Sequence, residues 1–292
     1  MANPNLRLAE NAAGEFFVDS TCIDCDTCRQ IAPATFRDHG DQSSVYRQPD
    51  SEEELQLANM ALVACPTGSI GAGHLLNAKL GVDSFPRLIA ENIYYCGFNS
   101  EASFGAWSYL IARPQDKGGN LLVDSPRFAS PLVKKIEKMG GIKQIFLTHR
   151  DDIADHDLFA GKFGATQIMH ADDGARRYGI EQIIEGEDEV KLDDELTIIP
   201  TSGHTRGSQV LLYKSKYLFT GDHLGWSPNR NSLIAFRAVC WYSWNKQISS
   251  MEKLLDYEFE WVLPGHGRIA HRSRKEMKKH LIDCIEWMKN VK

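Results

Sequence analysis

Short apolar runs alternate with helix-like patterns over most of the chain after residue 100. The runs are rich in Leu, Ile, Val and aromatic residues and are bounded by turn residues, which is typical of buried strands. The predicted strands are residues 108–112, 120–124, 144–148, 196–199, 210–213, 217–220 and 261–263. The predicted helices are residues 131–139, 157–163, 247–257 and 274–289. This alternation predicts sheets that are buried by helices.

The beginning of the chain has a different pattern. Residues up to about 70 are rich in Asp, Thr and turn residues, apart from a helical pattern at 51–63. This predicts a small, loop-rich domain that depends on a metal group for its stability. The Gly and Pro residues within 71–86 predict a linker lying over the next domain. We therefore divide the chain into a domain of residues 1–79, which includes the linker, and a domain of residues 80–292.

Composition narrows the class of protein. A chain of 292 residues with 42% hydrophobic content has enough core material for two packed domains. A net charge of −6 argues against nucleic-acid binding, which normally needs a basic face. No apolar run has the length of a membrane span and no leader pattern is present, so we expect no membrane association and a cytoplasmic location.

Three cysteines, Cys22, Cys25 and Cys28, recur at every third position, and Cys65 lies further along before a proline. Closely spaced cysteines without a leader favour metal ligation over a disulfide framework. Four thiolates in this arrangement can hold an iron-sulfur cube. With the flanking Val18-Asp19 and the segment 65–70, the motif resembles monocluster bacterial ferredoxins over about residues 16–70, which implies one 4Fe-4S cluster. A structural zinc site with the same thiolates is the alternative, although zinc sites usually present two separated pairs.

A second set of metal-binding side chains follows the predicted strands. His149, His204, Asp222 and His266 each come soon after a strand, where loops on a rigid frame carry function. These imidazoles and carboxylates are far apart in sequence and can converge on divalent ions only if the sheets bring them together. The motifs around them resemble the metallo-β-lactamase superfamily. The resemblance implies an αββα fold, two facing sheets flanked by helices, for residues 85–292.

The same resemblance implies a ligand set for one or two divalent metals. It places His149 and His204 on one metal, Asp155, His156 and His266 on the other, and Asp222 between the two. It also places Asp124 just outside the ligands. We expect Asp155 to orient a metal-bound water and Asp222 to complete the catalytic centre.

The first motif departs from the family pattern His-x-His-x-Asp-His. The second histidine is absent, and two extra residues precede Asp155-His156. Asp151 is the natural substitute and Asp152 is its rival, while a third interpretation leaves this position empty and binds a single ion. A carboxylate in place of an imidazole hardens the site and favours iron or manganese over zinc. Flavodiiron proteins resemble this pattern, although their spacing differs.

Other residues near these motifs could have a structural or a functional role. We expect His170 to be a hydrogen-bonded structural histidine. His223 is either structural or turned toward a substrate. Trp226, Trp241 and Trp244 form either one wall of a substrate pocket or part of a helix-packing core.

Three functions fit these motifs. A redox enzyme uses both sites, since the cluster would pass single electrons to one or two irons acting on dioxygen or a small oxidised substrate. We favour this function, which also calls for an electron-transfer partner. A hydrolase would use a metal-bound hydroxide on a thioester, lactone or phosphoester. A redox sensor without catalysis is the third function.

Overall fold

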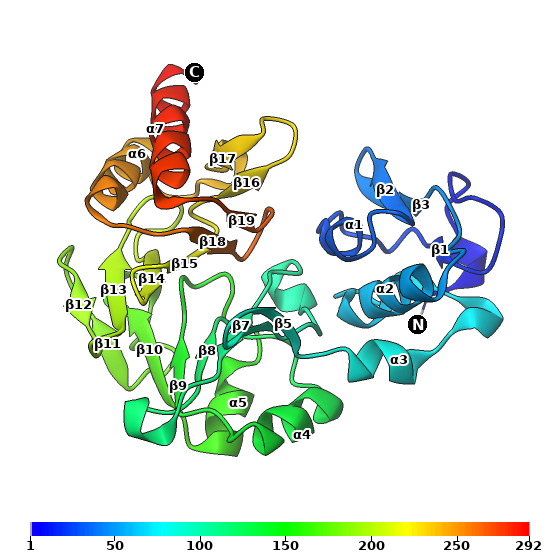
Figure 1. Ribbon diagram of the computed structural model, residues 1–292, viewed down its shortest axis with the longest axis horizontal. Helices are drawn as coiled ribbons and strands as arrows, with labels where there is room; N and C mark the ends of the chain where they lie inside the picture. The colour runs from blue at the N-terminus through cyan, green and yellow to red at the C-terminus, as the bar shows by residue number, and fades with distance from the viewer. Residues whose placement is uncertain (1, 292) are drawn as a thin grey trace.

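The computed structural model describes residues 2–291 and divides them into a small N-terminal domain and a larger layered domain (Figure 1). The small domain, drawn in blue and cyan, lies beside the β5–β7 end of the larger one. Within the described residues, every helix is too short or too polar to span a lipid bilayer.

The small domain brings its two cysteine segments together by pairing its ends. Antiparallel pairing of β1 with β4 aligns Val18 with Ile70. The triplet follows β1 and Cys65 precedes β4, so this pairing places them on the same side of the domain. The elements are η1 (Pro4–Leu6), β1 (Phe17–Val18), α1 (Thr27–Ile31), β2 (Phe36–His39), β3 (Gln42–Val45), α2 (Glu52–Ala64), β4 (Ile70–Gly71) and η2 (Gly73–Leu75).

The expected linker contains a helix that packs on the small domain. Helix α3 (Ala78–Asp83) lies against α2. Gly81 permits this approach, because a Cβ at that position would come within 2.4 Å of the Asn59 carbonyl oxygen. The predicted division at residue 80 therefore falls inside α3, and the first strand of the larger domain begins at Arg87.

One sheet of the larger domain has seven strands in the order β11-β10-β9-β8-β7-β6-β5. Strands β5 to β8 are antiparallel neighbours, and β8 to β11 are parallel neighbours. The strands are β5 (Arg87–Ala90), β6 (Ile93–Tyr95), β7 (Tyr109–Ile111), β8 (Leu121–Val123), β9 (Gln144–Phe146), β10 (Thr166–His170) and β11 (Gln182–Ile184). Helices α4 (Ser130–Lys138) and α5 (His156–Phe163) cover its outer face.

The other sheet has six strands in the order β12-β13-β14-β15-β18-β19. They are β12 (Val190–Lys191), β13 (Leu196–Pro200), β14 (Gln209–Tyr213), β15 (Tyr217–Gly221), β18 (Trp261–Pro264) and β19 (Ala270–His271). A hairpin of β16 (Gly225–Ser227) and β17 (Ser232–Ile234) adjoins it. Helices α6 (Trp244–Lys253) and α7 (Arg274–Asn290) pack on its outer face. Short 3-10 helices complete the domain at Glu101–Ser103 (η3), Gln115–Lys117 (η4), Ala171–Asp173 (η5), Arg237–Val239 (η6) and Leu254–Asp256 (η7).

Alternation along β14 explains why both faces of this sheet are apolar. Leu211 and Tyr213 point into the core between the sheets, whereas Val210 and Leu212 join the core beneath α6 and α7. Successive side chains of a strand point to opposite faces, so a strand buried on both faces is a continuous apolar run. The expected arrangement of two facing sheets flanked by helices is therefore present, and the site residues lie in the loops at one end of the strands.

Candidate metal and cluster sites

The four cysteines of the small domain line one small cavity. Cys22, Cys25, Cys28 and Cys65 surround it together with apolar residues that include Val18 and Ile70, and all four are free thiols. Burial raises the pKa of the Cys25 thiol to about 11 and also raises that of Cys28. Four convergent cysteine sulfurs that form no disulfide are suitable ligands for an iron-sulfur cluster. The positive charge of bound iron would stabilise the negative charge of the four thiolates.

Hydrogen-bond donors also point at these sulfurs. The Ser43 amide donates to Cys22 Sγ at 3.4 Å, and Thr67 Oγ1 lies 3.7 Å from Cys65 Sγ. Hydrogen bonds to cluster sulfurs are one of the means by which a protein tunes reduction potential. The small domain thus provides both the ligands and polar groups around them.

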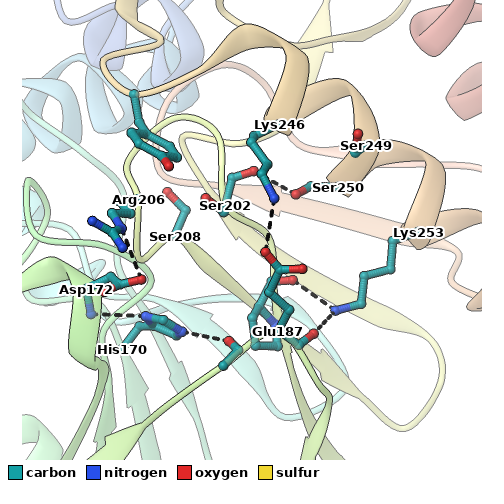
Figure 2. Close-up of a pocket in the computed structure, with 13 residues that line it drawn as sticks. His170, Asp172, Glu187, Ser202, Arg206, Ser208, Lys246, Ser249, Ser250 and Lys253 are labelled. Atoms are coloured by element: carbon teal, nitrogen blue, oxygen red, sulfur yellow. Dashed lines mark hydrogen bonds and ion pairs between the residues drawn. The ribbon is translucent and has the colours of Figure 1, made fainter.

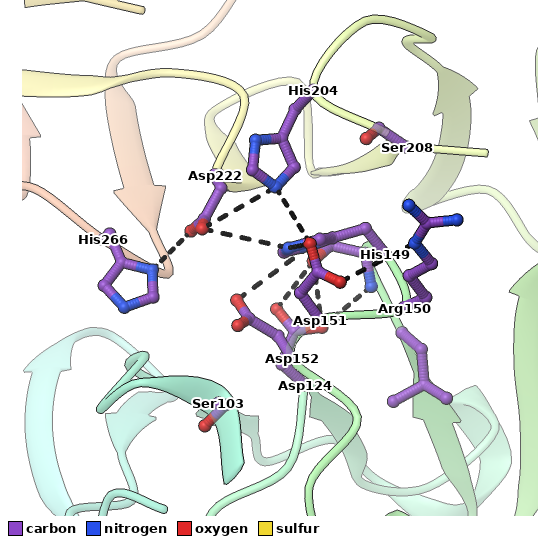
Figure 3. Close-up of polar contacts among 12 residues, drawn as sticks. Ser103, Asp124, His149, Arg150, Asp151, Asp152, His204, Ser208, Asp222 and His266 are labelled. Carbon is purple, nitrogen blue, oxygen red and sulfur yellow. Dashed lines mark hydrogen bonds and ion pairs between the residues drawn. The ribbon is translucent and has the colours of Figure 1, made fainter. Parts of the chain in front are cut away.

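In the larger domain, side chains that follow different strands converge in two groups (Figure 3). One group is His149, His204 and Asp222, and the other is Asp152, Asp222 and His266. Within each group, one potential ligand atom of each residue lies within 4.8 Å of those of the other two. His149 follows β9, His204 follows β13, Asp222 directly follows β15 and His266 follows β18. Asp222 belongs to both groups, as expected for a bridging position.

The structure gives Asp151 and Asp152 separate places. The Asp151 Oδ2 atom lies 3.5 Å from His204 Nε2 and 4.0 Å from His149 Nε2, so Asp151 adjoins the first group. Asp152 is buried and belongs to the second group. The two aspartates therefore face different halves of the site instead of competing for one.

Asp155 and His156 lie away from both groups, contrary to the expected ligand set. The Asp155 carboxylate accepts a hydrogen bond from the Phe128 amide at 2.7 Å. His156 bonds through Nδ1 to Gln167 Oε1, and its ring packs edge-on against Tyr178. The reason is local, because the chain turns at Ala154, with φ of 35°, and begins α5 at His156. In this structure Asp152, and not the Asp155-His156 pair, lies beside Asp222 and His266.

The burial of these groups without partners matches a cation-binding site. His149 Nε2, His204 Nε2 and Asp152 Oδ2 are buried, and no described residue forms a hydrogen bond with them. Burial, reinforced by the charge of Asp222, raises the pKa of Asp152 well above its usual range. Burial also lowers the pKa of His149 to about 4 and so keeps its imidazole neutral, the form that binds metal. Unpaired buried carboxylates and imidazole nitrogens are costly unless a metal satisfies them.

Asp124 orients His149 through Thr148. The Thr148 amide donates to Asp124 Oδ1 at 2.8 Å, and the Thr148 hydroxyl donates to the same carboxylate at 3.0 Å. That hydroxyl oxygen lies 3.0 Å from His149 Nδ1, so Nδ1–H donates to it and Nε2 is left facing the site. Burial raises the pKa of Asp124 to about 8. Such partners fix the tautomer and orientation of a ligand histidine.

Comparison with known proteins bears on both domains. Residues 18–72 match the family model described as the 4Fe-4S single cluster domain of ferredoxin I. The DIM-1 metallo-β-lactamase exposed to ceftazidime aligns with 69% of this chain and 95% of its own, at a TM-score of 0.51 and 21% identity. The larger domain has the metallo-β-lactamase fold. ETHE1 from Myxococcus xanthus aligns similarly, over 68% of this chain and 90% of its own, at a TM-score of 0.50 and 20% identity.

A curated relative covers part of the same domain. Hydroxyacylglutathione hydrolase of Enterobacter sp. (strain 638) is 30% identical over 118 residues, which are 39% of this chain. The match spans only 46% of the length of that relative. It therefore supports an enzymatic function for the metallo-β-lactamase-fold domain.

A cavity of about 640 Å³ opens onto the metal-binding groups of the metallo-β-lactamase-fold domain. Its walls include Phe104, Phe236 and Trp241, and a cavity of this size suits a small molecule. Of the three tryptophans considered from the sequence, only Trp241 lines it. Trp226 packs against His280, and Trp244 packs against Trp287.

His170 and His223, the other two histidines considered from the sequence, have different environments. The Asp172 amide donates to His170 Nδ1, so His170 Nε2–H donates to the Gly186 carbonyl, and the ring is satisfied as a structural histidine. His223 is buried, and burial lowers its pKa to about 3. Neither of its ring nitrogens has a hydrogen-bond partner among the described residues.

One loop of the metallo-β-lactamase-fold domain touches both sites, which the sequence did not indicate. Gly105 lies against Cys25, and Asn99 Nδ2 donates to the Gly105 carbonyl at 2.6 Å and to Thr27 Oγ1 at 3.0 Å. The carbonyl of the preceding residue, Phe104, accepts from His266 Nε2 at 3.3 Å, and His266 Nδ1–H donates to Asp222 Oδ1 at 2.7 Å. A cysteine of the small domain and a histidine of the metal site thus contact adjacent residues of the same loop.

Proposed function

We propose that this protein is a redox metalloenzyme in which the small domain delivers single electrons to a metal site that acts on a small-molecule substrate. A 4Fe-4S cluster supplies single electrons, and iron held by imidazoles and carboxylates supplies activation of dioxygen or reduction of a small oxidised substrate. The contact series Cys25, Gly105, Phe104 and His266 supports this proposal most directly, because it joins the two sites through one short loop.

The donor set supports iron at the second site. Asp151, Asp152 and Asp222 would supply three carboxylates beside the imidazoles of His149, His204 and His266. Carboxylate oxygen is a harder donor than imidazole nitrogen and shifts preference from zinc toward iron or manganese. Replacing the expected Asp155-His156 pair by Asp152 removes one imidazole from the set and strengthens this preference.

The protein groups have distinct roles in this proposal. Asp124 and Thr148 hold the His149 ring, and Phe104 O holds the His266 ring. Phe104, Phe236 and Trp241 form an apolar wall that limits water around the substrate. The electrons have to enter the small domain from a separate one-electron donor protein.

The alternative function is metal-dependent hydrolysis, which the hydroxyacylglutathione hydrolase relative favours. In that case Asp152, buried beside Asp222, would orient a water on the metals, and the small domain would be structural or regulatory. A sensor without catalysis is the third candidate.

Elemental analysis of anaerobically purified protein, combined with turnover assays, separates the three functions. We expect iron beyond the amount that the cysteines hold, and activity that depends on an added one-electron reductant. A matched pair of variants assigns the iron: Cys25→Ser should lower cluster iron and sulfide, whereas Asp222→Asn should lower only the second pool. Zinc in the second pool, with thioester or lactone hydrolysis that ignores the reductant, would establish the hydrolase. Substrate binding without turnover under either condition would establish the sensor.

A further inference from the structure

A second cavity, of about 350 Å³, lies beside the loop that carries His204 (Figure 2). That loop gives Ser202, Arg206 and Ser208 to this cavity, whereas His204 lines the metal cavity. The end of β10, the β11–β12 connection and helix α6 form the other walls. The lining residues are mostly polar, and they include three cations and two carboxylates: Arg206, Lys246, Lys253, Asp172 and Glu187.

Lys253 brings a half-buried positive charge into the cavity. Its Nζ donates to the Glu187 carbonyl at 2.5 Å and to the Pro200 carbonyl at 3.1 Å. An ammonium has three N–H donors, so one is left for a ligand. Burial lowers the pKa of Lys253, which means that its charge is poorly solvated and that an anion beside it would be favoured.

Arg206 and Lys246 also have donors to spare. Arg206 reaches Asp172 through Nε at 3.3 Å, which leaves both terminal nitrogens of its guanidinium without a carboxylate among the described residues. Lys246 Nζ contacts a single carboxylate oxygen, Glu187 Oε1, at 3.1 Å. One oxygen of each carboxylate is therefore engaged by a cation, while each cation retains free N–H groups. A guanidinium with two free terminal nitrogens suits bidentate binding of a carboxylate or phosphate.

Hydroxyl groups complete the lining of the cavity, and His170 has no ring nitrogen free to bind a ligand. Ser202 and Tyr242 contribute hydroxyls that can donate to an oxyanion, whereas the Ser208 hydroxyl already donates to Thr205 Oγ1 at 2.7 Å. His170 is already bonded at both ring nitrogens. With three cations against two carboxylates, the lining carries a net positive charge, which favours an anionic ligand over a cationic one.

We propose that this cavity binds the carboxylate or phosphate group of a small organic anion, held by Arg206, Lys246 and Lys253. The site is separate from the metal centre and does not depend on the proposed redox function. The two cavities nevertheless share a wall. The amides of Trp241 and Tyr242 both donate to the His204 carbonyl, at 2.9 and 3.1 Å, while Trp241 lines the metal cavity and Tyr242 lines this one.

Isothermal titration calorimetry of the metal-loaded protein with inorganic phosphate, and separately with succinate, tests the proposal and distinguishes the two sources of oxyanion. We expect saturable binding of at least one probe. Arg206→Gln and Lys246→Gln should each weaken it roughly tenfold or more, since hydrogen bonds to charged groups contribute about 1.5–3 kcal/mol. The affinity of Arg206→Lys for the probe should lie between that of Arg206→Gln and that of the unchanged protein. Lysine keeps the positive charge but lacks the planar guanidinium that binds an oxyanion through two parallel hydrogen bonds.

Lys279→Gln provides the matched control, because Lys279 is an exposed lysine of α7 paired only with Asp283 in the described contacts. It should leave binding unchanged. Mass spectrometry after brief lysine acetylation should show that the bound probe protects Lys246 and Lys253 but not Lys279. Absence of saturable binding by both probes would overturn the proposal. Equal binding by all variants would also overturn it, since the anion would then bind elsewhere, for instance at the metals.

Discussion

Gly105 packs directly against Cys25, so that a Cβ on Gly105 would come 2.7 Å from Cys25 Cβ and 3.0 Å from its Sγ. The backbone of Gly105 is in the left-handed region, with φ of +84°. Both the space and the conformation therefore require glycine at this position. This contact joins the loop that carries Phe104 to a cysteine of the small domain.

Gly105→Ala is expected to displace Cys25 and lower the iron and sulfide content of the small domain. Gly118→Ala is the matched control, because Gly118 has φ of +86° and its nearest atom to a built Cβ is 3.6 Å away. Both variants should lose about 1–2 kcal/mol of unfolding free energy from the left-handed backbone. Only Gly105→Ala should lose cluster, as measured by iron and sulfide analysis. Equal cluster content in the two variants would contradict the contact.

Asp152→Asn is expected to weaken binding of the second metal, whereas Asp155→Asn is expected to leave it unchanged. Asp152 is buried beside Asp222 and His266, while Asp155 bonds to the Phe128 amide. Asp152→Asn should lower the metal affinity roughly 10- to 100-fold. This is the loss of affinity that follows when a residue hydrogen-bonded to a metal ligand is removed, and loss of a ligand should cost at least as much. Metal titration followed by elemental analysis measures it. The opposite result would restore Asp155 as a ligand.

The contribution of Asp124 to the stability of metal-free protein is expected to fall as pH rises from about 4 to about 8. Burial raises the folded-state pKa of Asp124 from 3.8 to about 8, so between these values the folded state holds a proton that the unfolded state has released. Asp152 adds to the effect in the same direction. Urea unfolding across this range should show that the stability of the unchanged protein, relative to that of Asp124→Asn, decreases as pH rises. An identical dependence would exclude Asp124 as the group responsible.

Trp241→Ala and Trp244→Ala are expected to separate ligand binding from stability. Trp241 lines the metal cavity and is 60% exposed, whereas Trp244 packs on Trp287 and donates to the Met288 carbonyl at 3.0 Å. Trp241→Ala should weaken binding of an aromatic hydroxamate to the metal-loaded site with little change in Tm. Trp244→Ala should lower unfolding free energy by about 3 kcal/mol and leave hydroxamate affinity unchanged. Reversed effects would show that Trp244, and not Trp241, borders the ligand.

The sequence predicted the convergence of His149, His204, Asp222 and His266 because each follows a strand, and strand ends meet at one edge of a sheet. It predicted the cysteine cavity because ligand spacing is local. It placed Asp155-His156 among the ligands, whereas the structure brings Asp152 beside Asp222 and His266, because two extra residues and the turn at Ala154 separate the pair from His149. The contact of Gly105 with Cys25 could not be predicted either, since it depends on how the two domains pack.

The central claim is that electrons pass from the cysteine-bound cluster to the metal site. The direct measurement adds one reducing equivalent per chain to anaerobic, iron-loaded protein and follows both centres by rapid freezing and low-temperature paramagnetic resonance. The account predicts that the signal of the reduced cluster rises first and then decays as the second site gains the electron. A cluster that stays reduced while the second site keeps its original spectrum would contradict it.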